Sequence, residues 1–180
     1  MSVTNKSDPL AWLVLVWRLP TSESSANRVS VWRALRNLGA VGLTPGAAML
    51  PFSEDSVEQF DWLAQDVEDQ GGDAWVLPVG NLSGLEERRI RDRMRADRQV
   101  EYEDLRKEAA DFLKSRRQTG LIGSQNRSVR QRELVALQRR FQKIRARDFF
   151  DAPGRRQAAA SIDRCLASNV HLPTRAHRKE

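Results

Sequence analysis

The first 80 residues alternate between apolar runs of strand length and stretches with helical spacing. Residues 10–19, LAWLVLVWRL, form a nearly continuous apolar run that Pro20 ends, which predicts a buried central strand. A helix is predicted to begin at residues 24–25, two serines that suit an N-cap, and to end near Leu38. The apolar face of this helix is expected to carry Val31, Trp32, Leu35 and Leu38.

Two short apolar pieces follow and predict a β-hairpin. They are residues 40–43 and 47–51, and a Thr-Pro-Gly turn separates them. Ser53 begins a second predicted helix, and residues 75–79 form a last strand. The apolar face of the second helix is expected to carry Val57, Phe60, Ala64 and Val67. The order β-α-β-β-α-β predicts an α+β domain of the ferredoxin-like type over residues 10–80, with both helices on one face of an antiparallel sheet.

The pattern changes near residue 80, because the rest of the chain has helical spacing and no further strand signal. We expect a basic helical region over residues 81–168 and a disordered polar tail over residues 169–180. The helices of this region are predicted at residues 85–114, from Ser128 onward, and at residues 154–166. Residues 115–127 hold two glycines without periodicity and are predicted to form a mobile loop.

The middle helix of this region carries a narrow apolar seam that requires a partner. Ser128 and Gln131 form a capping box at its predicted start. The seam consists of Leu134, Leu137, Phe141 and Ile144 at 3-4-3 spacing. Two packing partners are possible for this seam: a second copy of the chain, which makes a homodimer, or the preceding long helix of the same chain.

Charge divides the chain into two unlike halves. Residues 1–80 carry 5 basic and 10 acidic side chains, whereas residues 81–180 carry 25 and 14. A basic half of this kind is typical of proteins that bind nucleic acid or another polyanion. The alternative is that the acidic half docks on the basic half.

Two helical stripes of basic residues are the candidate nucleic-acid contacts. Residues at 3-4-3 spacing share one side of a helix, so such stripes can follow a phosphate backbone. The candidates are Arg88, Arg91, Arg95 and Arg98 on the first long helix, and Arg139, Arg140, Lys143 and Arg147 on the second. The alternative is a solvated, ion-paired face, because acidic residues are interleaved with the first stripe: Glu86, Glu87, Asp92 and Asp97.

An arginine and the tryptophans of the first domain have structural and functional interpretations. Helical projection places Arg28 on the same side as Trp32 and Leu35, where it either pairs with an acidic group or binds an oxyanion.

The chain has five tryptophans, all in predicted strands or helices of the first domain: Trp12, Trp17, Trp32, Trp62 and Trp75. Core packing explains them better than stacking on bases does.

The sequence offers no set of residues for catalysis or for a cofactor. Both histidines, His171 and His177, lie in the predicted tail, and no Cys/His cluster or phosphate-binding glycine loop is present. The first strand lacks the carboxylate that a metal-dependent nuclease on this fold requires. Cys165 is the one cysteine, and residues 10–16 are too few to span a bilayer. We therefore expect a cytoplasmic protein that is not an enzyme, binds no cofactor and does not enter a membrane.

Two stretches of the sequence resemble a known family. WLVLVWRLP with NRVSVWRALRNLGAVGLTPGAAMLP, and later IRARDFFDAPGRRQA, resemble the N-terminal domain of the chromate-resistance regulator family ChrB. The matching positions in the first stretch are Arg28, Trp32, Arg33, Leu35, Leu38, Gly39, Ala40, Leu50 and Pro51. In the second they are Asp148, Phe149, Phe150, Pro153 and Gly154, with Asp151 and Ala152 inserted. The resemblance implies a bacterial transcription regulator of a chromate-efflux operon that responds to chromate.

Two function classes therefore stand ahead of an enzyme. The first is a DNA-binding regulator that responds to chromate or a similar oxyanion. Arg28 and Arg33 are its oxyanion-binding candidates, because guanidinium groups suit tetrahedral dianions. The second is a protein-interaction or anion-sensing module that does not bind DNA. Phosphate contacts predict a steep fall of affinity with salt, which distinguishes the two.

Overall fold

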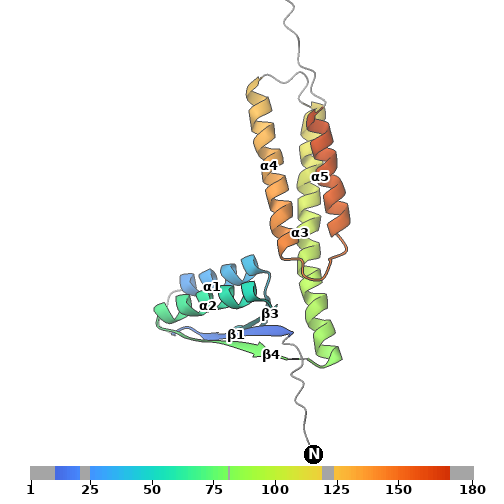
Figure 1. Cartoon of the computed structure of the whole chain (residues 1–180). Coiled ribbons are helices and arrows are strands. Elements are labelled where there is room, and N and C mark those ends of the chain that lie inside the picture. Colours follow the sequence, from blue (N-terminus) through green and yellow to red (C-terminus); the bar gives the residue numbers. More distant parts are fainter. Residues whose placement is uncertain (1–10, 21–24, 81, 119–123, 171–180) are drawn as a thin grey trace, which may run out of the picture. The chain divides into compact units, whose positions relative to one another are not determined.

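The computed structural model describes residues 11–20, 25–80, 82–118 and 124–170 (Figure 1). The chain divides into two compact units, and the boundary between them follows Met94.

The first unit is a four-stranded antiparallel sheet with two helices. Its elements are β1 (Trp12–Arg18), α1 (Ser25–Leu38), β2 (Val41–Thr44), β3 (Ala47–Pro51), α2 (Glu54–Asp69) and β4 (Asp73–Val79). The strand order is β2-β3-β1-β4, with β1 between β3 and β4. This element order and this sheet order together confirm the predicted α+β, ferredoxin-like fold.

The core of the first unit lies between the sheet and its helices. Side chains alternate between the two faces of a strand, so Leu13 and Leu15 of β1 point the same way and pair in register with Leu50 and Ala48 of β3. These side chains pack on the buried residues of α1 and α2: Val31, Leu35, Phe60, Leu63 and Val67. Figure 1 shows both helices on one side of the sheet, as predicted.

Three tryptophans of the first unit are exposed, so the prediction that core packing explains all five is wrong for them. Trp32, Trp62 and Trp75 are 54%, 69% and 54% exposed. Trp32 lies about 100° around α1 from the buried Val31, at the edge of the apolar stripe. There the Arg36 guanidinium lies 4.8 Å from the centroid of the Trp32 ring, as a cation–π pair.

The second unit is a bundle of helices. It contains α4 (Ser124–Ala146), α5 (Arg155–Val170) and the part of α3 (Gly84–Gln118) that follows Met94. The α4 seam packs on Tyr102, Leu105, Ala109 and Phe112 of α3 and on Ala158, Ile162 and Cys165 of α5. Of the two packing partners that the sequence allowed, the structure shows the helices of the same chain, so the seam does not require a second copy.

The helices extend further into their connection than the sequence predicts. Residues 115–118 continue α3, since Arg and Gln favour helix, and only residues 119–123 of the predicted loop lie outside the described part. Ser128 is inside α4, where its carbonyl oxygen accepts a 3.4 Å hydrogen bond from Arg132 Nε. The predicted capping box at Ser128 is therefore wrong. The predicted tail is wrong for residues 169 and 170, which continue α5, and residues 171–180 lie outside the described residues.

Candidate nucleic-acid interface

The strongest concentration of positive charge in the described helices lies on α4. Its sequence holds seven basic residues and one acidic residue, Glu133. The longer α3 holds eleven basic and nine acidic residues. Interleaved charges of opposite sign cancel within a short distance in salt solution, so α4 presents the stronger positive field.

Three cations line up on the outer side of α4, and we call Arg132, Arg139 and Lys143 the basic stripe. At 100° per residue they fall within about 40° of one another, and the buried seam lies on the other side of the helix. Val135 and Ala136 supply apolar surface between them. A hollow of about 620 Å³ is lined by Gln131, Arg132, Val135, Ala136, Arg139, Arg140 and Lys143. The stripe extends about 16 Å along the helix axis.

The basic stripe lacks carboxylate partners. Arg139 and Lys143 are both exposed. Neither forms an ion pair with any residue that the structure describes. Arg132 is exposed and donates to the backbone carbonyl of Ser128. The charges of the stripe are therefore available to an external anion.

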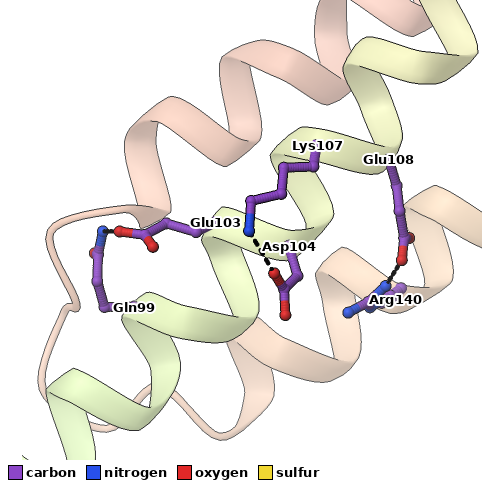
Figure 2. Close-up of polar contacts among 6 residues, drawn as sticks. All are labelled: Gln99, Glu103, Asp104, Lys107, Glu108 and Arg140. Carbon is purple, nitrogen blue, oxygen red and sulfur yellow. Dashed lines mark hydrogen bonds and ion pairs between the residues drawn. The ribbon is translucent and has the colours of Figure 1, made fainter.

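Five basic residues of α3 are ion-paired with acids of the same helix: Arg89, Arg91, Arg98, Lys107 and Lys114. Lys107 Nζ lies 3.0 Å from Asp104 Oδ1, a pair visible in Figure 2, and Lys114 Nζ lies 3.2 Å from Asp111 Oδ1. Of the first predicted stripe, Arg88, Arg91 and Arg95 are exposed, and Arg91 is paired with Glu87. Among the interleaved acids, Glu86 and Glu87 form ion pairs, with Arg89 and Arg91, whereas Arg88 and Arg95 form none with a described residue, so the ion-paired face accounts for only part of this stripe.

Two of the predicted contact residues, Arg98 and Arg147, are enclosed within the fold. Arg98 is 5% exposed, and its Nη2 lies 2.9 Å from Glu101 Oε1. Arg147 Nη2 donates to Glu101 Oε2 at 2.8 Å, and Arg147 Nε donates to the Lys143 carbonyl at 3.0 Å. A guanidinium held in this way cannot reach a phosphate without breaking the pair. We therefore correct their role: Arg98 pairs with Glu101 within α3, and Arg147, one residue after the end of α4, links this end of α4 to α3 through the same carboxylate.

Arg140 has an intermediate position among the predicted contact residues. Figure 2 shows its side chain reaching from α4 to Glu108 on α3, with which it forms an ion pair. The side chain keeps 38% of its surface exposed and lines the hollow beside the stripe. It connects the two helices and adds to the edge of the basic surface.

Sequence reasoning missed one structural arginine, Arg130. This residue is 6% exposed, its Nη2 donates to the Phe112 carbonyl at 3.2 Å, and its guanidinium lies 4.1 Å from the Phe112 ring centroid. A sequence signal existed, because Arg130 precedes Leu134 by four residues and so extends the apolar seam backward by one turn.

The segment with the DFF motif forms an ordered connection between α4 and α5. Asp148 Oδ2 accepts from the Tyr102 hydroxyl at 3.1 Å, and Asp148 Oδ1 accepts from the Ala152 N–H at 2.9 Å. Ala152, one of the two inserted residues, is 3% exposed, and Asp151 before it takes a positive φ of 50°. Burial, and secondarily Asp148, raise the pKa of Tyr102. The insertion thus contributes a side chain to the core.

The two oxyanion candidates lie on different sides of α1. Arg28 and Arg33 are both exposed, and five residues place them about 140° apart around the helix axis. Arg28 projects to within about 20° of the buried Leu35, as predicted, but it is exposed, so the core-facing stripe does not extend two turns back to this end of α1. The two guanidinium groups therefore do not converge on one small anion.

Other chemistry has little support in the described residues. No three His, Cys, Asp or Glu side chains there are grouped to hold a metal ion. Cys165 is buried beside the Ala109 carbonyl, and burial raises the pKa of its thiol, which makes it a poor nucleophile. In the same part of the chain, none of the helices is apolar over enough length to cross a bilayer.

The fold and its surface define a class of protein: a ferredoxin-like α+β unit followed by a helical bundle with an unpaired basic stripe. The family model "Protein ChrB, N-terminal" matches residues 28–179, so the chain belongs to this family and the predicted resemblance is confirmed. A curated relative, Protein ChrB of Cupriavidus metallidurans, is 36% identical over 102 residues, which cover 57% of this chain and 31% of the relative. The match thus covers less than a third of that protein. No solved structure was found to match the chain.

Proposed function

We propose that the chain is a DNA-binding regulator of a chromate-resistance operon that acts in the cytoplasm and is not an enzyme. The observation that carries the proposal is the basic stripe, where Arg139 and Lys143 are exposed without a described carboxylate partner. Family membership supports the link to chromate resistance, because the resemblance to ChrB implies a regulator of chromate efflux.

The basic stripe acts through phosphate contacts. Each neutralised phosphate of duplex DNA releases counterions, so the logarithm of affinity falls with the logarithm of salt concentration by about 0.9 per contact. Three cations of one chain therefore give a slope of about −3. Such contacts hold the protein on DNA of any sequence, and recognition of an operator requires contacts to base edges as well.

Fluorescence anisotropy tests the proposal with labelled DNA from upstream of the operon and a scrambled duplex of equal length. We expect tighter binding to the operator DNA, and a salt slope of about −3 per chain or steeper on both duplexes. If neither duplex binds at low salt, the protein is not a DNA-binding regulator.

The proposed effector is chromate or a similar tetrahedral oxyanion, an assignment that rests on the family resemblance. Chromate is expected to weaken operator binding at constant ionic strength. Sulfate, a tetrahedral dianion of the same charge, is the matched control. An equal response to both anions shows that any tetrahedral dianion has the effect and contradicts a chromate-specific effector role.

A further inference from the structure

The helix α2 presents an acidic surface that the proposed function does not use. Its 16 residues include seven carboxylates and no basic residue. One side of α2 packs on the sheet through Phe60, Leu63 and Val67. The opposite side is exposed, and three of the carboxylates line a hollow there together with an aromatic residue, Trp62.

The exposed side of α2 is hollowed, and we call this surface the acidic hollow. It has a volume of about 520 Å³. Its acidic lining comes from Glu54, Glu58 and Asp61, and its apolar lining from Phe52, Val57 and Trp62. Trp62 is 69% exposed, which is unusual for the largest apolar side chain unless a partner covers it.

The acidic hollow of α2 and the basic stripe of α4 are complementary in three respects. First, their charges are opposite, since carboxylates line one and unpaired cations line the other. Second, both have apolar surface between the charges, from Val57 and Trp62 on α2 and from Val135 and Ala136 on α4. Third, the linings are of similar length: the α2 part spans residues 54–65 and the α4 lining spans residues 131–143, about 16 and 18 Å along the helix axes.

We propose that the acidic hollow of one chain binds the basic stripe of a second copy of the chain. Both surfaces are exposed in the single chain, so each is available to another molecule. The chemistry of the contact is an ion-pair network around a buried tryptophan, in which Trp62 accepts a cation–π contact from an arginine of the stripe. Two reciprocal contacts close a two-fold dimer, whereas one contact per pair propagates a chain.

The proposal has a consequence that rests on the proposed function. The basic stripe is the surface assigned to phosphate contacts, so a second copy and DNA compete for the same cations. Self-association then lowers the concentration of DNA-binding protein, and DNA shifts the chain toward the dissociated form. Both contacts weaken with salt, because both are electrostatic.

Sedimentation velocity of the full chain tests the self-association in the absence of DNA. Glu58→Lys with Asp61→Lys reverses the acidic hollow, and Arg139→Glu with Lys143→Glu reverses the basic stripe. The wild-type chain is expected to associate at low salt, and each reversed variant is expected to remain at the mass of one chain, 20.5 kDa. Mixing the two variants restores association, because each reversed surface meets the complementary reversed surface of the other variant.

Two further variants separate the specific contact from general charge effects. Asp55→Lys with Asp66→Lys makes the same change in net charge at exposed positions of α2 outside the hollow, and it is expected to leave association within about twofold of wild type. Trp62→Ala removes the apolar centre and is expected to weaken association at least tenfold.

A wild-type chain that stays monomeric at all concentrations overturns the proposal. Association that persists in the Glu58→Lys, Asp61→Lys variant, or a mixture that stays monomeric, overturns it as well. These outcomes are independent of DNA binding, since none of the samples contains DNA. Conversely, a chain that associates as predicted and binds neither duplex retains this contact and loses the proposed function.

Discussion

Substitution of Glu101 by glutamine tests whether the ion cluster between α3 and α4 holds the bundle together. The Glu101 carboxylate lies between Arg98 and Arg147, at 2.9 and 2.8 Å. Glutamine removes the charge and leaves Arg98, which is 5% exposed, without a compensating anion among the described residues. Breaking a buried ion pair costs about 3–5 kcal/mol. Water partly reaches the Arg147 side, so we expect the lower end, about 3 kcal/mol.

Thermal and urea unfolding followed by circular dichroism measure this cost. A loss of about 3 kcal/mol lowers the Tm of a domain of this size by roughly 10–20 °C. The matched control is Asp104→Asn on the same helix, which removes an acid whose partner, Lys107, has a side chain 74% exposed. That change is expected to cost less than about 0.5 kcal/mol.

A second substitution distinguishes the lost charge from a general disturbance of α3. Arg98→Met combined with Glu101→Gln removes the uncompensated cation and is expected to recover part of the stability that Glu101→Gln loses. If Glu101→Gln proves as mild as Asp104→Asn, the cluster carries little energy and the assignment of Arg98 as a structural residue is refuted.

Two further substitutions and one chemical reaction test the turn before α5 and the core of the bundle. Tyr102→Phe removes the hydrogen bond to Asp148 and is expected to lower the free energy of unfolding by about 1–2 kcal/mol. Because the pKa of Tyr102 is raised in the folded chain, its contribution is fully present below about pH 10 and is lost at higher pH, so the variant's stability should depend less on alkaline pH in urea titrations. Gly154→Ala is expected to destabilise the bundle by about 1–3 kcal/mol, since the added Cβ would lie 3.1 Å from the Tyr102 Cβ and would displace Gln99 Oε1, which accepts a hydrogen bond from the Gly154 N–H. Cys165 is expected to react with a thiol reagent far more slowly in the native chain than in urea, and equal rates would contradict its burial.

Much of the first unit could be predicted from the sequence because its signals are local. The apolar run that became β1, the serine cap of α2 and the Thr-Pro-Gly turn each fix one element without reference to the rest of the chain. The exposed tryptophans could not be predicted in this way. Periodicity places Trp32 at the edge of the apolar stripe of α1, and only the packing of the helix against the sheet decides whether a residue at that edge is buried.

The candidate site shows where reasoning from charge alone fails. Spacing grouped Arg98 with Arg88, Arg91 and Arg95, although Arg98 also lies four residues before Tyr102 on the stripe that becomes the core. A search for regularly spaced charged residues does not reveal that one of them also lies on the apolar side of the helix. By contrast, the sequence could not predict that lysines of α3 are paired with carboxylates while the basic stripe of α4 is not, because ion pairing depends on side-chain geometry.

The salt dependence of DNA binding in a stripe variant tests the central claim most directly. Arg139→Gln with Lys143→Gln removes two unpaired charges, and the control, Lys107→Gln with Lys114→Gln, removes two charges that are paired on α3. In anisotropy titrations, the stripe variant is expected to bind at least tenfold more weakly and to lose about 2 from the magnitude of the salt slope, whereas the control loses less than about 1. Equal slopes for the stripe variant and the wild-type chain would contradict a phosphate interface on α4.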